Sequence, residues 1–237
     1  MRLNQAIQQT GLCSRRKADE WINEGRITVD GKVAILGMVI DENAIICLDG
    51  VKLEKTQQWV TLLYNKPLGI ECTTDQTISN NIIDAIGYPQ RIFPIGRLDK
   101  DSQGLILLTN DGDLVNPLLR AENKHEKEYE VKVNKTLTSE FLSALENGVE
   151  ITNTVKNERV VTQKCTVKQQ GEKQFTITLT QGFNRQIRKM TLALGYKVVH
   201  LRRIRIMNFK LGNLRVGTYR LLKEDEIKSL KEALKEH

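Results

Sequence analysis

The stretch Ile95-Gly-Arg-Leu-Asp-Lys-Asp-Ser-Gln-Gly-Leu-Ile-Leu-Leu-Thr109 places a polar, turn-rich loop between two short apolar segments. Short apolar runs bounded by turn residues are typical of buried strands, so we expect strands at 92–95 and 104–109. Loops held by a rigid sheet often carry catalytic side chains. The loop from Gly96 to Gly104, with its carboxylates Asp99 and Asp101, is therefore the first place to seek chemistry.

The same loop begins like a calcium-binding EF-hand, with Asp99, Asp101, Gln103 and Gly104 at matching positions. That motif needs a bidentate glutamate at its twelfth position, where this chain has Asn110. A strand is also expected in place of the helix that leaves an EF-hand loop. We therefore exclude a calcium loop.

A metal-dependent nuclease built on Asp99, Asp101, Asp111 and Asp113 is a second alternative, because dense carboxylates can bind magnesium. Their spacing matches no motif of fixed coordination geometry, and helix capping is enough to explain Asp111 and Asp113. We expect no metal and no cofactor.

Upstream of this region, the pattern predicts two helices and a hairpin. Residues 3–9 form a helix that Gly11 ends, and Ser14 caps a helix from Arg15 to Glu24. Asp30-Gly31 between alternating apolar residues indicates a tight hairpin. Residues 49–58 are polar and are expected to connect two domains. We therefore predict a small N-terminal module at 1–48, a linker at 49–58 and a larger domain at 59–237.

The larger domain mixes helical and strand patterns without a repeat. Strands are expected at 60–65, 92–95, 104–109, 128–133, 159–168, 173–180, 197–209 and 219–222, and helices at 81–86, 111–120, 139–146, 184–194 and 225–234. Strands outnumber helices and the two are interspersed. This predicts an α+β fold around a mixed, mainly antiparallel sheet.

Positive charge is concentrated rather than spread along the chain. The net charge is +7, and residues 173–223 contain twelve Lys or Arg and no Asp or Glu. A solvated face balanced by acids elsewhere would also fit. Because apolar and basic residues alternate there as in strands, we favour a surface that faces a polyanion.

The first turn of the second helix carries three cations, Arg15, Arg16 and Lys17. Cations at a helix N-terminus oppose the helix dipole, whereas a docked phosphate would relieve that conflict and accept bonds from free N–H groups. We therefore expect RNA contact there rather than three merely tolerated exposed cations.

The remaining composition limits the class of protein. Four single cysteines and three histidines do not cluster, so neither a zinc site nor a disulfide framework is expected. The apolar runs are too short to span a bilayer and the N-terminus lacks an apolar signal core. We expect a cytoplasmic protein without membrane contact.

Several motifs together resemble the RsuA/RluB/RluE/RluF family of pseudouridine synthases, and most of all its RluF type. The resemblance covers nearly the whole chain, and residues 1 to about 47 resemble the S4 RNA-binding module. Its motifs are Gly96-Arg-Leu-Asp99 with Ser102-Gln-Gly-Leu, Asn65-Lys-Pro-Leu-Gly69, Lys127-Glu-Tyr129 and Gln181-Gly-Phe-Asn-Arg-Gln-Ile-Arg188. Ser102 stands where many relatives have threonine, which keeps the hydroxyl.

The resemblance implies roles for the matching residues. Asp99 would be the nucleophile or base, Arg188 would pair with Asp99 and keep it ionised, and Tyr129 would stack on a flipped uracil. Weaker candidates for contact with the substrate RNA are Lys66, Arg97, Asn184 and Arg185.

The implied function is isomerisation of uridine to pseudouridine in structured RNA, without a cofactor. The implied substrate is 23S ribosomal RNA, with a tRNA as a second substrate, and we expect a monomer. The alternative from another class is a non-catalytic RNA-binding or ribosome-assembly protein. It would not need Asp99, Arg188 and Tyr129 together.

Overall fold

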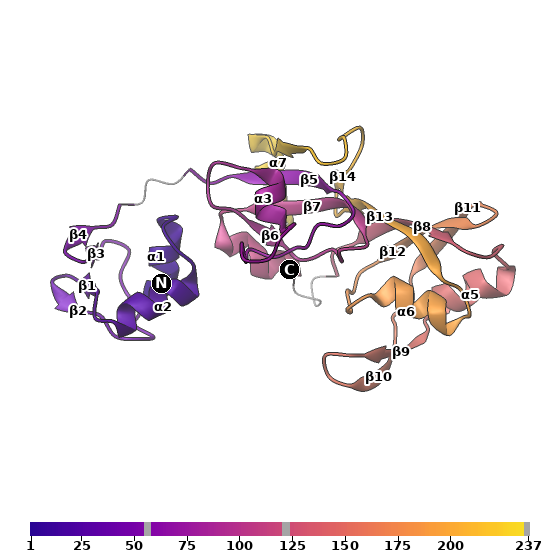
Figure 1. The fold of residues 1–237 in the computed structure, drawn as a ribbon, viewed down its shortest axis with the longest axis horizontal. Coiled ribbons are helices and arrows are strands. Elements are labelled where there is room, and N and C mark those ends of the chain that lie inside the picture. Colours follow the sequence, from indigo (N-terminus) through magenta and orange to yellow (C-terminus); the bar gives the residue numbers. More distant parts are fainter. Residues whose placement is uncertain (55–57, 120–123, 235–237) are drawn as a thin grey trace. The chain divides into compact units, whose positions relative to one another are not determined.

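The computed structural model describes residues 1–54, 58–119 and 124–234 (Figure 1). The chain divides into two compact units, one comprising Met1–Val60 with Pro89–Arg91 and Asn110–Gly112, the other comprising the remainder. The domain limits expected from the sequence, 1–48, 49–58 and 59–237, stay a prediction. Among the described residues, none of the helices has the length and apolar character needed to cross a membrane.

The N-terminal unit contains two helices and a small antiparallel sheet. Its elements are α1 (Leu3–Gln9), α2 (Arg15–Asn23), β1 (Ile27–Val29), β2 (Lys32–Val33), β3 (Ile46–Leu48) and β4 (Val51–Lys52), with strand order β2-β1-β3-β4. Ser14 caps α2 by accepting a bond from the Lys17 amide, as predicted. Asp30 and Gly31 both have positive φ, which is the turn that joins twisted strands tightly.

The segment predicted as a linker begins with a second tight hairpin. Asp49 and Gly50 repeat the positive-φ turn of the first hairpin, with φ of 49° and 81°, and Val51–Lys52 pairs with β3. Because this segment is polar, its composition did not predict the short, exposed edge strand that forms there. Residues 55–57 lie outside the described residues.

A nine-stranded sheet organises the larger unit. Its strands are β5 (Thr61–Lys66), β6 (Phe93–Ile95), β7 (Gln103–Thr109), β8 (Lys127–Val133), β11 (Thr166–Gly171), β12 (Gln174–Leu179), β13 (Val198–Ile206), β14 (Phe209–Lys210) and β15 (Tyr219–Leu221). The order is β11-β12-β8-β13-β7-β5-β15, with β14 beside β13 and β6 beside β7. The β13–β7 pair is parallel and the other pairs are antiparallel. The predicted α+β class with a mixed, mainly antiparallel sheet is confirmed.

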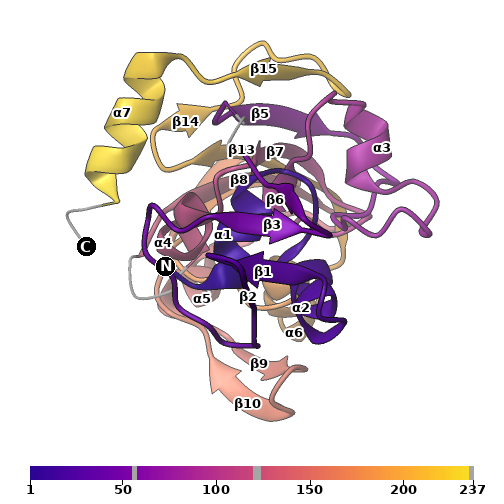
Figure 2. The ribbon, with the colours of Figure 1, turned by 90° about the vertical axis from the view of Figure 1, so that its left-hand side faces the viewer.

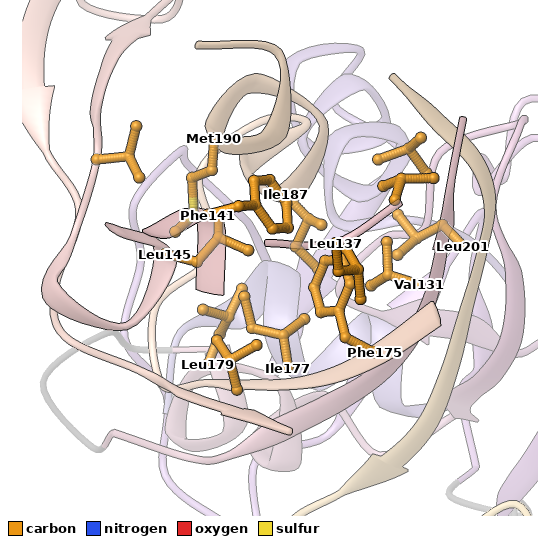
Figure 3. Close-up of a cluster of buried hydrophobic side chains, with 14 of the residues drawn as sticks. Val131, Leu137, Phe141, Leu145, Phe175, Ile177, Leu179, Ile187, Met190 and Leu201 are labelled. Atoms are coloured by element: carbon orange, nitrogen blue, oxygen red, sulfur yellow. The ribbon is translucent and has the colours of Figure 1, made fainter. Parts of the chain in front are cut away.

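Helices bury apolar side chains against this sheet. They are α3 (Ile82–Ile86), α4 (Val115–Leu119), α5 (Ser139–Asn147), α6 (Gln186–Ala193) and α7 (Glu224–Ala233). Phe141 of α5 and Met190 of α6 meet Phe175 and Ile177 of β12 in one buried cluster (Figure 3). Leu230 of α7 belongs to a second cluster, which includes Phe209 of β14. Figure 2 shows α7 beside β14. These cores fix α6 against the strands that carry the site described below.

Three predicted elements differ in their limits. The helix expected at 111–120 is a 3-10 turn (Gly112–Leu114) followed by the short α4, and Arg120 lies outside the described residues. The strand expected at 159–168 is two strands, β10 (Glu158–Val161) and β11, and β10 pairs with the unpredicted β9 (Glu150–Asn153). The strand expected at 197–209 ends at Ile206, because Met207, with φ of 51°, turns the chain into β14.

Gly104 permits the parallel contact at the centre of the sheet. Its φ is 112°, and a Cβ at this position would lie 2.3 Å from the carbonyl oxygen of Arg203. No side chain fits into that distance. The glycine at the end of the polar loop therefore lets β7 lie directly against β13.

Candidate active site

A cleft of about 510 Å³ opens in the larger unit beside the polar loop. Most of its lining comes from the loop at 95–102, strand β8, the segment 179–187 leading into α6, and strand β13. Leu107 of β7, Leu118 and Leu119 of α4, and Val155 line it as well. Asp99, Tyr129, Asn184 and Arg185 all line it, and so does Arg97. The structure thus brings together residues that lie nearly 90 positions apart in the sequence.

Three hydrogen bonds fix the backbone of the loop that carries Asp99. The Ser102 amide donates to the Asp99 carbonyl (3.0 Å), and the Gly69 amide donates to the Lys100 carbonyl (2.8 Å). The Leu98 amide donates to the sulfur of Cys72 (3.3 Å). These bonds fix the backbone while the Asp99 side chain stays 30% exposed to the cleft.

Lys66 does not line the cleft but supports this arrangement. Its ammonium is buried and donates to the carbonyl oxygens of Pro67 and Ile70, at 2.9 Å each. Burial lowers the pKa of Lys66. Lys66 holds the turn at 67–70, whose Gly69 amide in turn binds the loop that carries Asp99.

Two arginines of α6 reach the loop, and both bind Asp101. Arg185 forms a bidentate pair with the Asp101 carboxylate (2.9 and 2.8 Å) and lies 3.7 Å from an Asp99 oxygen. Arg188 donates from Nη2 to the Asp101 carbonyl (2.6 Å) and to the Ser102 hydroxyl (3.3 Å), with its Nε 3.4 Å from the Asp101 carboxylate. The hydrogen bonds from Arg185 hold the pKa of Asp101 below its usual value.

The predicted pairing of Arg188 with Asp99 is therefore wrong in this structure. Arg188 is only 14% exposed and its guanidinium is committed to Asp101 and Ser102, two and three residues further along the loop. The cation nearest Asp99 is Arg185, which the sequence suggested only as a substrate contact. Arg185 occupies the cap position of α6 with a left-handed backbone, which directs it toward the loop.

Tyr129, Lys127 and Arg203 line the cleft from neighbouring strands. Tyr129 of β8 lies opposite Arg203 of β13, whose guanidinium carbon is 6.0 Å from the centre of the tyrosine ring. Arg203 is 4% exposed, and its Nε donates to the Leu105 carbonyl at 2.7 Å. Burial and the nearby Arg203 lower the pKa of Lys127 to about 8.

The other predicted contacts are spread more widely. Arg97 and Asn184 line the cleft, and Arg97 makes no hydrogen bond or ion pair with another described residue. Arg15, Arg16 and Lys17 are exposed on α2 in the N-terminal unit. Lys17 is already paired with Glu20 at 2.7 Å, so it is less available than its neighbours.

Sequence reasoning did not single out Lys127, Arg203 or Asp101. For Lys127 a signal was present: it lies two residues before Tyr129 in a strand, so the two side chains share a face. Arg203 was one of the twelve Lys or Arg in residues 173–223, and no pattern distinguished it from the others. Asp101 was considered only as a metal ligand.

The nuclease alternative is not supported by the geometry. Over the described ranges, no three His, Cys, Asp or Glu side chains gather in a way that could hold a metal ion. Asp99 and Asp101 instead face arginines.

Comparison with known proteins agrees with this arrangement. Residues 60–193 match the family model described as RNA pseudouridylate synthase, and residues 1–46 match the S4 domain. The chain is 46% identical over 229 residues to the dual-specificity RNA pseudouridine synthase RluF of Escherichia coli (strain K12), covering 96% of this chain and 77% of that protein. It is 35% identical to the ribosomal large subunit pseudouridine synthase B of Bacillus subtilis (strain 168), covering 100% and 97%.

A solved crystal structure of a pseudouridylate synthase superposes with a TM-score of 0.70 at 26% identity. The match covers 97% of this chain and 99% of that one. Both units of the chain thus have counterparts in known proteins.

Proposed function

The chain belongs to the family of RNA pseudouridine synthases, and from that premise we propose that Asp99 is the carboxylate with which it isomerises uridine in large-subunit ribosomal RNA. The observation that supports this most is the placement of Asp99. It is the carboxylate that lines the cleft from a loop whose backbone is bonded on both sides. A fixed, partly exposed carboxylate is suited to reaction without a cofactor.

The reaction breaks the bond between C1′ and N1, turns the uracil, and joins C1′ to C5. Asp99 either attacks the sugar or removes a proton from it, and both roles need an ionised oxygen directed at the ribose. Arg185 places a cation 3.7 Å from an Asp99 oxygen. Arg188 holds the loop through Asp101 and Ser102 rather than by contact with Asp99.

Tyr129 stacks on the uracil in this proposal. Enzymes that act on a base in folded RNA must flip it out of its helix, and aromatic side chains commonly hold the flipped base. Tyr129 lies on the cleft wall formed by β8 and lines the same cavity as Asp99. Lys66 acts indirectly, by holding the turn beneath the loop.

The substrate assignment rests on the relatives. The Bacillus subtilis relative is named as a ribosomal large subunit enzyme, and the Escherichia coli relative is named as a dual-specificity enzyme. We infer large-subunit RNA as the main substrate and a tRNA as a second one. Arg97, Asn184 and the cations Arg15, Arg16 and Lys17 would bind the RNA backbone. The enzyme would act as a cytoplasmic monomer.

The test is pseudouridine mapping by carbodiimide treatment and reverse-transcription stops. It compares cells with the intact gene, cells lacking it, and cells complemented with Asp99→Asn. As a matched control, Asp225→Asn changes an exposed carboxylate of α7. We expect the deletion to lose a mark in large-subunit RNA that the wild type and Asp225→Asn restore and Asp99→Asn does not.

Two outcomes would contradict the proposal in different ways. Full restoration by Asp99→Asn would remove Asp99 from the catalytic role. Persistence of every ribosomal mark in the deletion, with a loss confined to tRNA, would replace the substrate while leaving the activity intact.

A further inference from the structure

Two cations, the half-buried Lys127 and the buried Arg203, line the cleft beside Tyr129. Residues 127 and 129 of β8 share one face of the strand because side chains alternate. Arg203 stands opposite Tyr129 in the β8–β13 register. The Lys127 ammonium donates to the His125 carbonyl at 3.2 Å, and both cations line the cavity.

Neither cation has a carboxylate partner among the described residues. The acidic neighbours on β8 belong to the opposite face: Glu128 binds Arg205 at 2.8 Å and Glu130 binds Arg202 at 3.7 Å. The Nη2 atom of Arg203 is buried and has no hydrogen-bond partner in the part of the chain that is described. The ionisable groups that share the cleft with Lys127 are Arg97, Asp99, Tyr129, Arg185 and Arg203.

This arrangement is costly unless something else supplies negative charge. A cation largely withdrawn from water, with a single carbonyl oxygen as its acceptor, recovers only part of the hydration that it loses. Charge of this kind in a cleft is typical of groups that the substrate completes. Burial and Arg203 lower the pKa of Lys127 to about 8.

The reaction itself produces an anion at this place. When the C1′–N1 bond breaks, both electrons stay on uracil, and the charge spreads over N1 and the carbonyl oxygens O2 and O4. C1′ then bonds to C5, C5 loses its proton, and N1 gains one, so the product is an isomer of the substrate. The charge exists only between the two bond changes, when the base is stacked beside Tyr129.

We propose that Lys127, positioned and supported by Arg203, stabilises the negative charge on a carbonyl oxygen of the detached uracil. The inference rests on the proposed function. A fixed cation in a water-poor cleft is most effective where charge develops in the transition state. A phosphate is a poorer fit, because a phosphate contact needs an accessible cation, whereas Arg203 is 4% exposed and Lys127 is half-buried.

The test measures release of tritium from large-subunit RNA transcribed with uridine tritiated at C5. The variants are Lys127→Met, Lys127→Arg and, as a matched control, Lys132→Met, which changes an exposed lysine of the same strand. We expect Lys127→Met to lower kcat by about 10²- to 10³-fold with little change in KM, the loss typical of removing one such stabilising group. Lys127→Arg should retain most activity and Lys132→Met all of it.

The pH profile separates a catalytic charge from a structural one. In the wild type, kcat/KM should fall as pH rises above about 8, because Lys127 of the free enzyme loses its proton. In Lys127→Arg this decline should disappear, because a guanidinium stays protonated. If Lys127→Met does not fold, as judged by circular dichroism, the Lys127→Arg profile alone decides.

Three results would overturn the inference: a Lys127→Met enzyme with near wild-type kcat, a raised KM with unchanged kcat, or the same alkaline decline in Lys127→Arg and wild type. The second would indicate a phosphate contact instead. A wild-type enzyme that releases no tritium would contradict the proposed function, not this inference.

Discussion

Asp101 binds both Arg185, which caps α6, and Arg188 of α6 to the loop that carries Asp99. Its carboxylate binds Arg185 in a bidentate pair, and its carbonyl accepts a bond from Arg188. Only the side-chain part of this network can be removed by substitution. The two functions of Asp101 can therefore be separated experimentally.

Asp101→Asn should lower kcat/KM by about tenfold, because a looser Arg185 costs on the order of 1.4 kcal/mol of transition-state stabilisation. Arg185→Ala should cost a similar amount, and the double variant should cost little more than either, since residues that act together are non-additive. Single-turnover rates of the four enzymes form the measurement. Fully additive losses would show that Asp101 and Arg185 act separately.

Lys66 makes a second residue-level prediction, on stability. Lys66→Met leaves the carbonyls of Pro67 and Ile70 without their buried donor, at a cost of about 1–3 kcal/mol. Urea denaturation of the variant measures it. Lys132→Met, an exposed lysine in a strand of the same unit, should change the free energy of unfolding by no more than about 0.5 kcal/mol. Equal effects of the two substitutions would contradict this reading.

At the residue scale, the motifs singled out Asp99, Tyr129 and Arg188, and their chemical roles stay a prediction. Asp99 and Tyr129 both line the cleft, whereas Arg188 binds Asp101 and Ser102. The pairing of Arg188 was wrong because a motif does not show where a long, flexible side chain ends. Two carboxylates lie within three positions of the loop, and only the coordinates show which one each arginine reaches.

Among the elements, the parallel contact of β7 with β13 depends on Gly104. Gly104→Ala would place its Cβ 2.3 Å from the Arg203 carbonyl oxygen, at a φ of 112°. Neither backbone can give way without breaking the sheet. We expect a loss of more than about 3 kcal/mol, or no folded protein, from strain and clash together.

The matched control is Gly171→Ala, because the nearest atom to a Cβ there lies 3.9 Å away and no unusual φ is needed. It should change the free energy of unfolding by no more than about 1 kcal/mol. Urea denaturation followed by circular dichroism compares the two. A Gly104→Ala protein as stable as Gly171→Ala would show that the sheet does not need this close approach.

The start of α7 gives a pH-dependent prediction. Glu226 accepts bonds from Arg220 (2.7 Å twice) and from the Lys223 amide, which lower its pKa from 4.5 to about 2. Because the folded-state pKa is the lower one, this contribution is complete above pH 4.5 and is lost as pH falls toward 2. Glu226→Gln should therefore destabilise the protein by about 1 kcal/mol at pH 7, since the pair is partly exposed.

Thermal denaturation of wild type and Glu226→Gln between pH 2 and pH 7 measures that difference. The two melting temperatures should converge as the pH approaches 2. A constant gap across this range would show that the carboxylate charge is not what stabilises the helix start.

Most element types were predictable, whereas short strands were not. Long alternating segments such as β8 and β13 were correctly predicted as strands. The β9–β10 hairpin failed because β10 has no buried alternation: its four residues are exposed or half-exposed. A strand without a buried face shows no alternation of apolar and polar residues. The prediction therefore joined β10 and β11 into one strand.

At the scale of the whole molecule, the sheet is built from partners far apart in the chain. β5 lies between β7 and β15, whose residues are more than 100 positions apart. Periodicity identifies a strand but not its neighbour, so the strand order could not be read from the sequence. The fold class could, because the mixture and order of helices and strands limit the possible layers.

Charge is the other property of the whole molecule that leads to a test. The net charge of +7 predicts RNA binding that weakens with salt. The cations of α2 contribute only if they meet phosphates. Arg15 donates to Asn4 at 3.2 Å and Lys17 pairs with Glu20, so Arg16 is the freest of the three.

Replacing Arg15, Arg16 and Lys17 by glutamine should weaken RNA binding while leaving kcat at saturating RNA unchanged, because the cleft residues are untouched. Each lost phosphate contact reduces the slope of log affinity against log salt by about 0.7–0.9, so one to three contacts give a measurable change. Filter binding from 50 to 300 mM KCl with large-subunit RNA measures the slope, and Lys32→Gln, on an exposed hairpin of the same unit, is the control. An unchanged slope in the triple variant would show that α2 carries no phosphate contact, and that the basic residues of the larger unit bind the RNA backbone without it.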